Sequence, residues 1–596
     1  MIKVDEATRR RFRRSLRRRR RGTLETVAQA DDKIERLLIR RFDRLVSVRR
    51  FVFLWILLFL IMIFVTFEQI RGLSPYYQSL QPIPGGLYTE GLLGNFTNAN
   101  PLYATGAADE AVSHLVFDGL FKYDNSNRLV GDLATSYNLD GSQQNYTVHL
   151  RHNVKWQDGK PFTADDVVFT YDTIQNFDAE SSLYTSWQGI NVTKVDRYTV
   201  NFNLPNPLSS FPYSLVNGIV PAHLLASIPV EQLRSAPFNT NPVGTGPFKW
   251  KYVDVTGDSV ENREQRISLS ANDNYWPGAP KLDGFSIITY SDEQQLVSAF
   301  EKKQLNAVSG LDQLPPELAT DRSVQAYYTP LTTSVMAFFN NSRPQLNSAT
   351  IRKALERGVD RGQIVNLLGA PVQLVNGPLL KSQLGYDPKV LEPSFSVPAA
   401  NKLFAAAGYK KNASGTLVKD GLPLTISISA QNTANYTRVA QFLQHQWNKL
   451  GVKVNINYYS SDDLQTSIIG THNYDVLLYG INIGVDPDVF AYWDSSQASL
   501  SSQGHLNLSE YKSKVADQAI EAGRTRADPS IRAAKYDTFL KQWVKDVPAI
   551  GLYQPNYLYV TRGPVFGYER RADNASSDRF YSVAGWEIRQ QRKTNQ

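Results

Sequence analysis

The sequence predicts an α/β protein that follows a single transmembrane helix. Residues 424–479 read in the order strand, helix, strand, helix, strand, and this alternation favours a mostly parallel sheet. Far upstream, Phe51 to Val65 is a run of fifteen apolar residues without interruption. With 596 residues, the chain is long enough for about three to four domain-sized units.

The first 50 residues are strongly basic, and the rest of the chain is not. Residues 1–50 hold 18 Lys or Arg and 7 Asp or Glu, whereas the other 546 residues hold 46 and 49. Arg9 to Arg21 is a block of like charge, which is typical of a segment drawn to anionic lipid headgroups. No aromatic interleaving or folded motif accompanies it, so no nucleic-acid partner is expected. Residues 31–48 place apolar side chains at helical spacing among arginines, which predicts an amphipathic helix on the inner membrane face or against a partner helix.

The apolar run predicts an uncleaved signal-anchor at residues 51–67. These seventeen residues span about 26 Å as a helix, which is near the lower limit for crossing a bilayer. A buried helix and a cleaved signal peptide are the alternatives, but the run is apolar on every face and no small-residue cleavage site follows it. The excess of Lys and Arg before the run predicts a single-pass protein of the cytoplasmic membrane, with residues 1–50 in the cytoplasm. A linker at 68–86, rich in proline and glycine, then leads to an extracytoplasmic main domain.

Short strands and helices alternate irregularly after the linker. Asn145 to Leu150 alternates polar and apolar residues, as a half-buried strand does, and Thr163 with Asp166 marks the start of a helix. Further strands are expected at 198–204, 267–271, 335–340, 424–430, 452–458 and 474–479, and helices at 293–304, 350–366, 399–408 and 436–450.

Composition and motifs give no sign of catalysis. The chain has no cysteine, which excludes disulfides, thiolate metal sites and cysteine nucleophiles. Residues 244–246 (Gly-Thr-Gly) lack the Lys-Ser/Thr of a phosphate loop, and Ser509 to Lys512 matches the Ser-x-x-Lys pattern of acyl-transfer enzymes without its companion motifs. His149 and His152 lie three apart at the end of a strand and point to opposite faces. No catalytic residue, cofactor or metal site is expected.

Motifs in a fixed order extend from residue 117 to residue 488. In the first half they are Phe117-Asp118-Gly119-Leu120, 131–134, 146–151, 154–156, 158–159, 163–171, 241–248 and 274–276. In the second half they are Asn340 with Arg343-Pro344, 351–355, 359–361, 406–409, Tyr474-Asp475 and Asp486-Pro487-Asp488. This series resembles family 5 of the bacterial solute-binding proteins, the peptide- and nickel-binding receptors of ABC importers. The resemblance covers about residues 85–567.

The resemblance implies a two-lobe periplasmic-binding-protein-like fold of type II, in the large cluster with an extra subdomain. We expect lobe 1 at 87–289, lobe 2 at 290–485, and a return to lobe 1 with a C-terminal tail at 486–596. The implied protein is not an enzyme. It binds oligopeptide-like ligands between the lobes, closes over them and delivers them to ABC permease and ATPase subunits. A receptor for another solute, such as a glycan fragment or a metallophore, stays open, as does a sensory or structural ectodomain that signals through the cytoplasmic N-terminus.

The resemblance also implies where ligand contacts lie. In peptide receptors, extended segments of both lobes hold the ligand, and these correspond here to residues 105–109, which include Ala107, and residues 480–488. The aspartate that pairs with the peptide α-ammonium group in such receptors falls on Ile483 or Gly484, so this chain departs from the pattern.

Asp486 is the carboxylate nearest in sequence to Ile483 and Gly484, and it could replace the ammonium-binding aspartate of the peptide receptors. Its alternative is a turn residue before Pro487. Five other side chains could line the cleft: Asn340, Tyr479, Asn482, Tyr492 and Trp493. For the aromatic ones, packing in the core or between the lobes is the alternative.

Overall fold

The computed structural model describes residues 49–259, 263–369, 371–501, 505–571 and 573–594. They belong to two compact units, one made of the two chain ends, 1–81 and 590–596, and one made of residues 82–589. The predicted amphipathic helix at 31–48 and the basic block before it lie outside the described residues.

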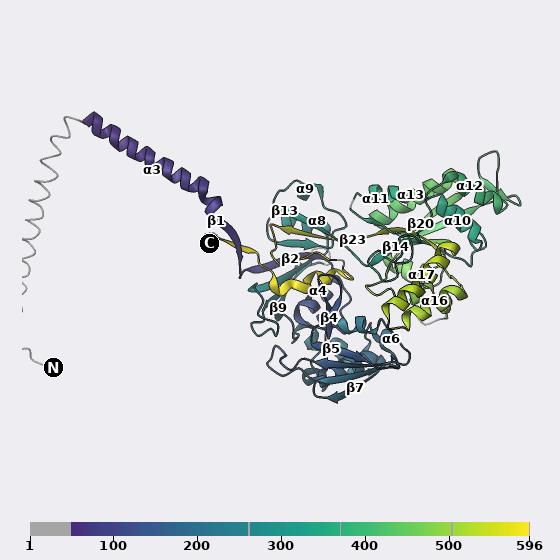
Figure 1. Ribbon diagram of the computed structural model, residues 1–596, viewed down its shortest axis with the longest axis horizontal. Coiled ribbons are helices and arrows are strands. Elements are labelled where there is room, and N and C mark those ends of the chain that lie inside the picture. The colour runs from purple at the N-terminus through teal and green to yellow at the C-terminus, as the bar shows by residue number, and fades with distance from the viewer. Residues whose placement is uncertain (1–48, 260–262, 370, 502–504, 572, 595–596) are drawn as a thin grey trace, which may run out of the picture. The chain divides into compact units, whose positions relative to one another are not determined.

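Helix α3 (Arg49–Tyr77) contains the predicted membrane span (Figure 1). Its window Phe51–Gln69 is long and apolar enough to cross a membrane, and its large apolar side chains are exposed. Within the predicted linker at 68–86, the helix continues to Tyr77, and strand β1 (Gln78–Ile83) then pairs with the C-terminal strand β24 (Arg589–Thr594). Proline and glycine content could not reveal a pairing between segments five hundred residues apart.

The first large sheet has seven strands and contains strands from distant parts of the chain. Their order is β13 (Val324–Pro330), β23 (Asn556–Arg562), β12 (Ala307–Ser309), β2 (Leu87–Leu93), β11 (Gly284–Tyr290), β10 (Glu264–Ala271) and β9 (Phe248–Thr256). Strand β2 is parallel to β11 and β12, while the other pairs are antiparallel. Every residue of β11 is buried, because the sheet has an apolar core on both faces.

A four-stranded antiparallel sheet forms the extra subdomain, with β5 (Ala134–Leu139), β6 (Asn145–Leu150), β8 (Thr199–Asn203) and β7 (Asn191–Asp196) in that order. The predicted strand at 145–150 is confirmed, since alternate residues of β6 are buried. The predicted helix start is confirmed too. Helix α5 (Ala164–Gln175) begins after Thr163, whose backbone N–H donates to the Asp166 carboxylate at 2.9 Å.

The Gly-Thr-Gly segment at 244–246 is a structural turn packed against the end of helix α4 (Ala107–Val116). The backbone N–H of Gly246 donates to the carbonyl oxygen of Val116 at 2.8 Å. A Cβ atom on Gly244 would lie 1.8 Å from the same oxygen. Glycine is therefore required here by close backbone approach, with no role in phosphate binding.

The second large sheet has six strands, in the order β15 (Gln373–Leu374), β22 (Ala549–Gln554), β14 (Thr333–Phe339), β21 (Val476–Asn482), β19 (Thr425–Gln431) and β20 (Lys453–Tyr459). Strand β19 is parallel to both β20 and β21, so the parallel arrangement predicted from 424–479 is confirmed for these three strands. The expectation of a mostly parallel sheet is wrong for the sheet as a whole, because β14, β22 and β15 join it through antiparallel pairs. Helix α13 (Ala434–Leu450) connects β19 to β20. Successive residues of β14 enter two different apolar cores, so the sheet is covered on both faces.

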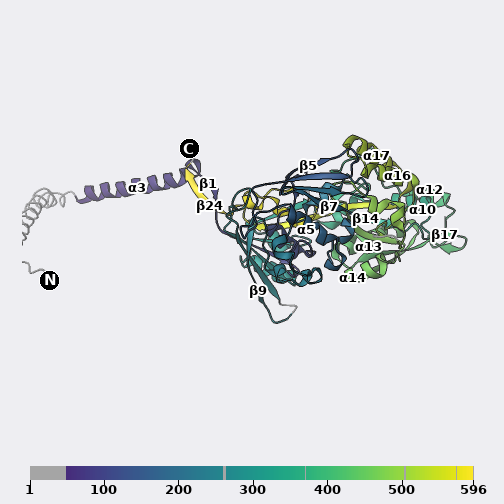
Figure 2. The ribbon, with the colours of Figure 1, turned by 90° about the horizontal axis from the view of Figure 1, so that it is seen from below.

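The chain crosses between the two sheets later than the sequence predicts. Strands β12 and β13, from the stretch assigned to lobe 2, belong to the seven-stranded sheet, and β22, from the predicted return, belongs to the six-stranded sheet. Helices α16 (Lys514–Arg524) and α17 (Pro529–Asp546), which lie side by side in Figure 1 and Figure 2, also contribute to the core of the second sheet. We therefore define lobe 1 as residues 82–330 and 556–589, and lobe 2 as residues 331–555. Sheet membership follows from long-range pairing, which single-segment patterns do not contain.

A second difference concerns the helix predicted at 350–366. It is two helices, α10 (Ala349–Arg357) and α11 (Gly362–Leu368), separated at Gly358. A Cβ atom on Gly358 would lie 2.3 Å from Cδ1 of Leu450, so the break fits the close packing against α13.

Candidate ligand-binding site

A cavity of about 350 Å³ lies in lobe 1. Helix α4, strand β3 (Phe121–Tyr123) and the segment 571–584 enclose it, and every lining residue belongs to lobe 1. Its volume lies within the range of small-molecule sites, roughly 300–1,000 Å³. The cavity is the candidate site because it combines this size with charged and aromatic side chains.

One end of the cavity is a cluster of buried charges and aromatic rings. The Lys122 ammonium group lies 2.8 Å from the Asp132 carboxylate and 5.8 Å from the centre of the Trp276 ring. Asp118 accepts hydrogen bonds from the Tyr275 hydroxyl at 3.1 Å and the Trp276 ring N–H at 3.3 Å. Burial raises the pKa of Asp118 and of Asp132, and the nearby Lys122 opposes both shifts. Lys122 is thus shared by two carboxylates, and the Arg151 guanidinium lies on the same Trp276 ring, 4.4 Å from its centre.

A second charged group lies on the segment 571–584. The Arg571 Nε is 3.4 Å from Asp573 Oδ1, and its guanidinium lies 4.3 Å from the centre of the Tyr581 ring. Burial raises the pKa of Asp573 to about 7, to which the charge of Asp578 also contributes. Asp578 accepts a hydrogen bond from the backbone N–H of Asn574 at 2.9 Å, which fixes the entry to the helical segment η8 (Ser576–Gly585).

Helix α4 adds Glu110 and His114 to the lining, one turn apart. His114 Nε2 lies 3.9 Å from Asp578 Oδ1. Burial, and the charge of Asp578, raise the pKa of the Glu110 carboxyl to about 6. Ser577 also lines the cavity and is almost fully buried. The α4 side of the cavity is therefore acidic.

The cavity wall contacts lobe 2 at Asn574. The side-chain N–H of Asn482, at the end of β21, donates to the backbone oxygen of Asn574 at 3.1 Å. The Thr332 hydroxyl lies 3.1 Å from the Asn482 side-chain oxygen and 2.8 Å from that of Asn574. The Tyr492 hydroxyl donates to the backbone oxygen of Asn482 at 2.8 Å. A lining residue of lobe 1 is thus part of the seam between the lobes.

A second contact between the lobes lies at Asp488. Its carboxylate accepts from the Ser210 hydroxyl of lobe 1 at 2.9 Å and from the Arg524 guanidinium of lobe 2 at 3.1 Å. The backbone N–H of Ser209 donates to the Arg524 carbonyl oxygen at 2.8 Å. Direct hydrogen bonds join the lobes here and at Asn574. Others do so elsewhere, such as the bond from the backbone N–H of Ala527 to the Gln143 side-chain oxygen at 2.8 Å.

The structure brings two of the predicted residues together, and two others lie on elements of the two lobes. Asn482 and Tyr492 meet at the seam, as described above. Ala107 is exposed as the first residue of α4, three positions before Glu110. Tyr479 is half-buried on β21, and its hydroxyl accepts from the Gln465 side chain at 2.5 Å. Ligand contact by these residues stays a prediction.

Asp486 lies in a buried ion pair. Its carboxylate oxygens lie 2.6 and 2.8 Å from the two terminal nitrogens of Arg532, and the side chains are 6% and 7% exposed. The Arg532 Nε donates to the Gly523 carbonyl oxygen at 2.9 Å. The charge of Asp486 is thus already balanced within lobe 2.

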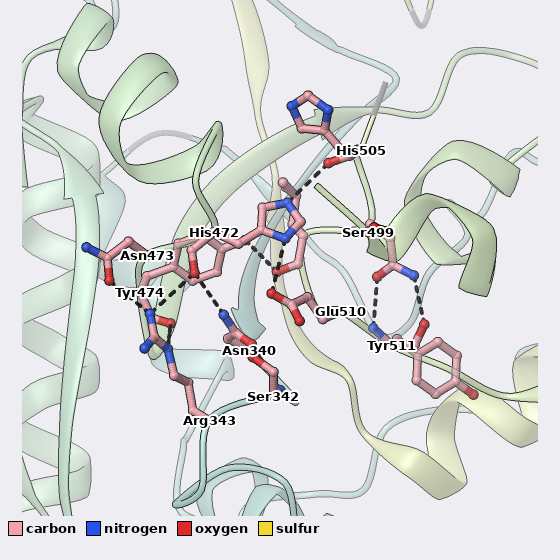
Figure 3. Close-up of polar contacts among 12 residues, drawn as sticks. Asn340, Ser342, Arg343, His472, Asn473, Tyr474, Ser499, His505, Glu510 and Tyr511 are labelled. Carbon is pink, nitrogen blue, oxygen red and sulfur yellow. Dashed lines mark hydrogen bonds and ion pairs between the residues drawn. The ribbon is translucent and has the colours of Figure 1, made fainter. Parts of the chain in front are cut away.

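Asn340 and Trp493 are enclosed in lobe 2. The Trp493 ring stacks on Phe338 with 5.7 Å between centres, which is the packing alternative left open by the sequence. Asn340 donates from its side chain to the carbonyl oxygen of His472 at 3.0 Å. Figure 3 shows Asn340 and Arg343 both directed at this carbonyl group, so Asn340 stabilises a turn.

The sequence reasoning missed the lining residues of 571–584 and missed Glu110. The motifs of the family resemblance end before residue 567, and no local pattern joins the C-terminal segment to α4. Glu110 could have been predicted from the sequence, because it lies within one helical turn of the predicted contact Ala107 and would share the same face of the helix.

Residues 128–502, more than half of the chain, match the family described as bacterial extracellular solute-binding proteins, family 5. The chain belongs to this family. It is 28% identical over 491 residues to the oligopeptide-binding protein AppA of Bacillus subtilis, which covers 80% of this chain and 87% of AppA.

Solved structures agree with this assignment. NikZ from Campylobacter jejuni, in complex with Ni(L-His), is 26% identical with a TM-score of 0.70, over 84% of this chain and 99% of NikZ. AppA from Bacillus subtilis, in complex with a nonapeptide, shares the fold with a TM-score of 0.68 at 24% identity, over 85% of this chain and 100% of AppA. Among the residues that the structure describes here, no group of three or more His, Cys, Asp or Glu side chains is placed to hold a metal ion.

Proposed function

We propose that this protein is a membrane-anchored receptor that binds oligopeptide-like ligands between its two lobes and delivers them to an ABC permease and its ATPase. The observation that carries the proposal is the lobe 1 cavity whose wall residue Asn574 is hydrogen-bonded to Asn482 of lobe 2. A ligand in this cavity lies next to the seam. A ligand that extends from the cavity past Asn574 to the seam would contact both lobes. Such contacts favour the closed arrangement over the open one, which is how a binding event becomes a signal to a permease.

An oligopeptide-like ligand suits the lining. The cavity offers carboxylates, an arginine and a lysine, the Asn574 amide and aromatic rings, so a ligand with regularly spaced donors and acceptors can match them. Each buried polar group left unmatched costs about 1–3 kcal/mol. The similar AppA of Bacillus subtilis is named an oligopeptide-binding protein and was solved with a nonapeptide, which supports the same ligand class here. The mechanism consists of binding, closure and docking, with no covalent step.

Helix α3 supports the proposed anchor, with Phe51–Gln69 in the membrane and the main domain outside the cytoplasm. The basic residues of 1–50 would then face the anionic headgroups of the cytoplasmic leaflet. Carbonate extraction of membranes tests the anchor. The full chain should stay in the membrane pellet, and a chain lacking residues 1–77 and carrying a cleavable secretion signal should be released. Extraction of the full chain would contradict the anchor.

The ligand class is tested with the full chain in detergent. Native mass spectrometry should find co-purifying peptides, and a randomised pentapeptide library should raise the melting temperature. Glycan fragments and nickel–histidine serve as parallel additions for the alternative ligands. If either of these stabilises the protein and the peptide library does not, the peptide function is wrong.

A further inference from the structure

The carboxylates that line the cavity outnumber its cations. The lining contains Glu110, Asp118, Asp132 and Asp578 against Lys122 and Arg571. Both cations are already paired, Lys122 with Asp132 and Arg571 with Asp573. An added cation is thus the charge that this cavity lacks.

Glu110 and Asp578 form the acidic side of the cavity. Asp578 lies 3.9 Å from the Arg571 guanidinium, which also pairs with Asp573 at 3.4 Å, so one arginine is shared by two carboxylates. The neighbour Asp109 differs from Glu110, because it accepts hydrogen bonds from the backbone N–H and hydroxyl of Thr97, each at 2.7 Å, and so holds the loop before α4. Arg579, the cation next to Asp578 in sequence, forms a fully buried ion pair with Glu90 of strand β2. Neither Asp109 nor Arg579 is thus available to a ligand or to Glu110 as a partner.

Two polar groups beside the acidic side make no well-formed hydrogen bond within the described part of the chain, although the Ser577 hydroxyl lies near the Glu110 carboxylate. The Ser577 hydroxyl belongs to a residue that is 1% exposed and lines the cavity. The Asn574 side-chain N–H also lines it. A buried hydroxyl without a partner is costly unless a ligand supplies one. The Ser577 hydroxyl can accept a hydrogen bond from an ammonium group, and the Asn574 side-chain N–H can donate to a carbonyl oxygen. An ammonium group and a carbonyl oxygen lie close together at the start of a peptide.

On the basis of the function proposed above, we propose that lobe 1 binds an alkylammonium group of the ligand through Glu110, with Asp578 and Ser577 beside it, and that Asn574 binds the adjacent carbonyl oxygen. The family position for an ammonium-binding aspartate falls on Ile483 or Gly484 in lobe 2, and Asp486 is paired with Arg532. The recognition of the cation has therefore moved to the other lobe. An α-ammonium group and a lysine side chain share this chemistry.

The pH dependence of binding follows from the groups that face Glu110. These are Asp109 and His114 on α4 and Asp578 and Arg579 on η8. A bound cation favours the ionised Glu110, whose pKa is raised to about 6 in the free protein. Affinity should therefore be full above this pH and fall about tenfold between pH 7.5 and pH 5. Protonation of His114 acts in the same direction, so a His114→Gln variant separates the two groups.

The test uses the full chain in detergent and three randomised pentapeptide libraries. The first has free amines and no Lys or Arg, the second is the same library N-acetylated, and the third is N-acetylated but contains Lys. Bound peptides are identified by mass spectrometry, and the best retained peptide is titrated. We expect retention of the first library, loss of the second, and partial retention of the third if a side-chain ammonium can enter.

Glu110→Gln should lower the affinity for the retained peptide at least tenfold and flatten the dependence of this affinity on pH. Glu317 is an exposed glutamate on the surface of lobe 1, and Glu317→Gln should change neither the affinity nor its pH dependence. Equal retention of the first two libraries by the unmodified protein, or an unchanged affinity and pH profile in a folded Glu110→Gln variant, would overturn the ammonium site and leave the peptide function standing. If no library is retained, the peptide function fails and the ammonium site fails with it.

Discussion

Replacing Asp486 with asparagine should destabilise lobe 2 strongly, although the substitution changes one oxygen to one nitrogen. Asp486 and Arg532 are joined by two charge-assisted hydrogen bonds of 2.6 and 2.8 Å, and both side chains are less than a tenth exposed. Asparagine can keep one of these contacts, but it leaves the guanidinium without a counter-charge in a site that water does not reach. Breaking a buried pair in this way costs about 3–5 kcal/mol. We expect Asp486→Asn to lower the free energy of unfolding by about that amount.

Urea unfolding of the full chain in detergent, followed by tryptophan fluorescence and circular dichroism, measures the change. Asp537→Asn is the matched control. Asp537 and Lys541 form a 2.6 Å ion pair on helix α17, which also carries Arg532, but this pair is exposed to solvent. The control substitution should leave the unfolding midpoint unchanged. A double variant, Asp486→Leu with Arg532→Met, should recover most of the loss, since it removes both charges together. Equal midpoints for Asp486→Asn and Asp537→Asn would refute the reasoning.

The same variant separates two roles for Asp486. If the ion pair is structural, a folded Asp486→Asn protein at low temperature binds peptide with nearly unchanged affinity. If Asp486 holds the ligand's ammonium group, the affinity falls while the unfolding midpoint stays the same. The pairing with Arg532 favours the first outcome.

Two further predictions concern the scaffold and its closure. Gly244→Ala should destabilise the protein by about 3 kcal/mol or more, because the new Cβ would lie 1.8 Å from the carbonyl oxygen of Val116. Gly141→Ala is the control. Its new Cβ meets no atom within 4 Å, so it should be nearly neutral in the same urea assay. Asp488→Asn should weaken peptide binding about tenfold, because it weakens the hydrogen bond that Ser210 of lobe 1 donates to the Asp488 carboxylate and breaks the Asp488–Arg524 pair that holds this carboxylate at the seam. The fraction of closed molecules in an interlobe fluorescence-transfer measurement should also fall, with no change for Asp537→Asn. Unchanged closure in Asp488→Asn would show that this contact does not hold the lobes together.

Much of the local structure could be predicted because it depends on nearby residues. The alternation of 145–150 gives strand β6, and the apolar face of 436–450 lies within helix α13. The parallel core of the second sheet was also predictable, since consecutive strand–helix–strand units favour one arrangement. The crossing points could not be predicted in this way, because the membership of β12 and β22 depends on partners that are far away in the sequence.

The site was less predictable than the fold. Asn482 and Tyr492 were predicted to line the cleft, and the structure places them at the seam, while ligand contact by them stays a prediction. The cavity itself joins α4 to a segment more than four hundred and fifty residues later, so no motif spacing marks Asp578 as a neighbour of Glu110. Burial was the other obstacle. Asp486 is chemically suited to bind a cation, and only its packing against Arg532 shows that its charge is already used.

The geometry of the 482–486 segment explains why the cation site would lie on lobe 1. Gly484 has a φ of +75°, a conformation that favours glycine, and its carbonyl oxygen accepts from the Gln383 side chain at 2.8 Å. Ile483 is buried in the core of lobe 2. Neither position can present a carboxylate to the ligand without strain or loss of core packing. A charged subsite built wholly on lobe 1 has a further consequence, because it can capture the ligand before closure. Asn482 then adds its contact with Asn574 only when the lobes meet, so capture and closure can be altered separately, by Glu110→Gln and by Asp488→Asn.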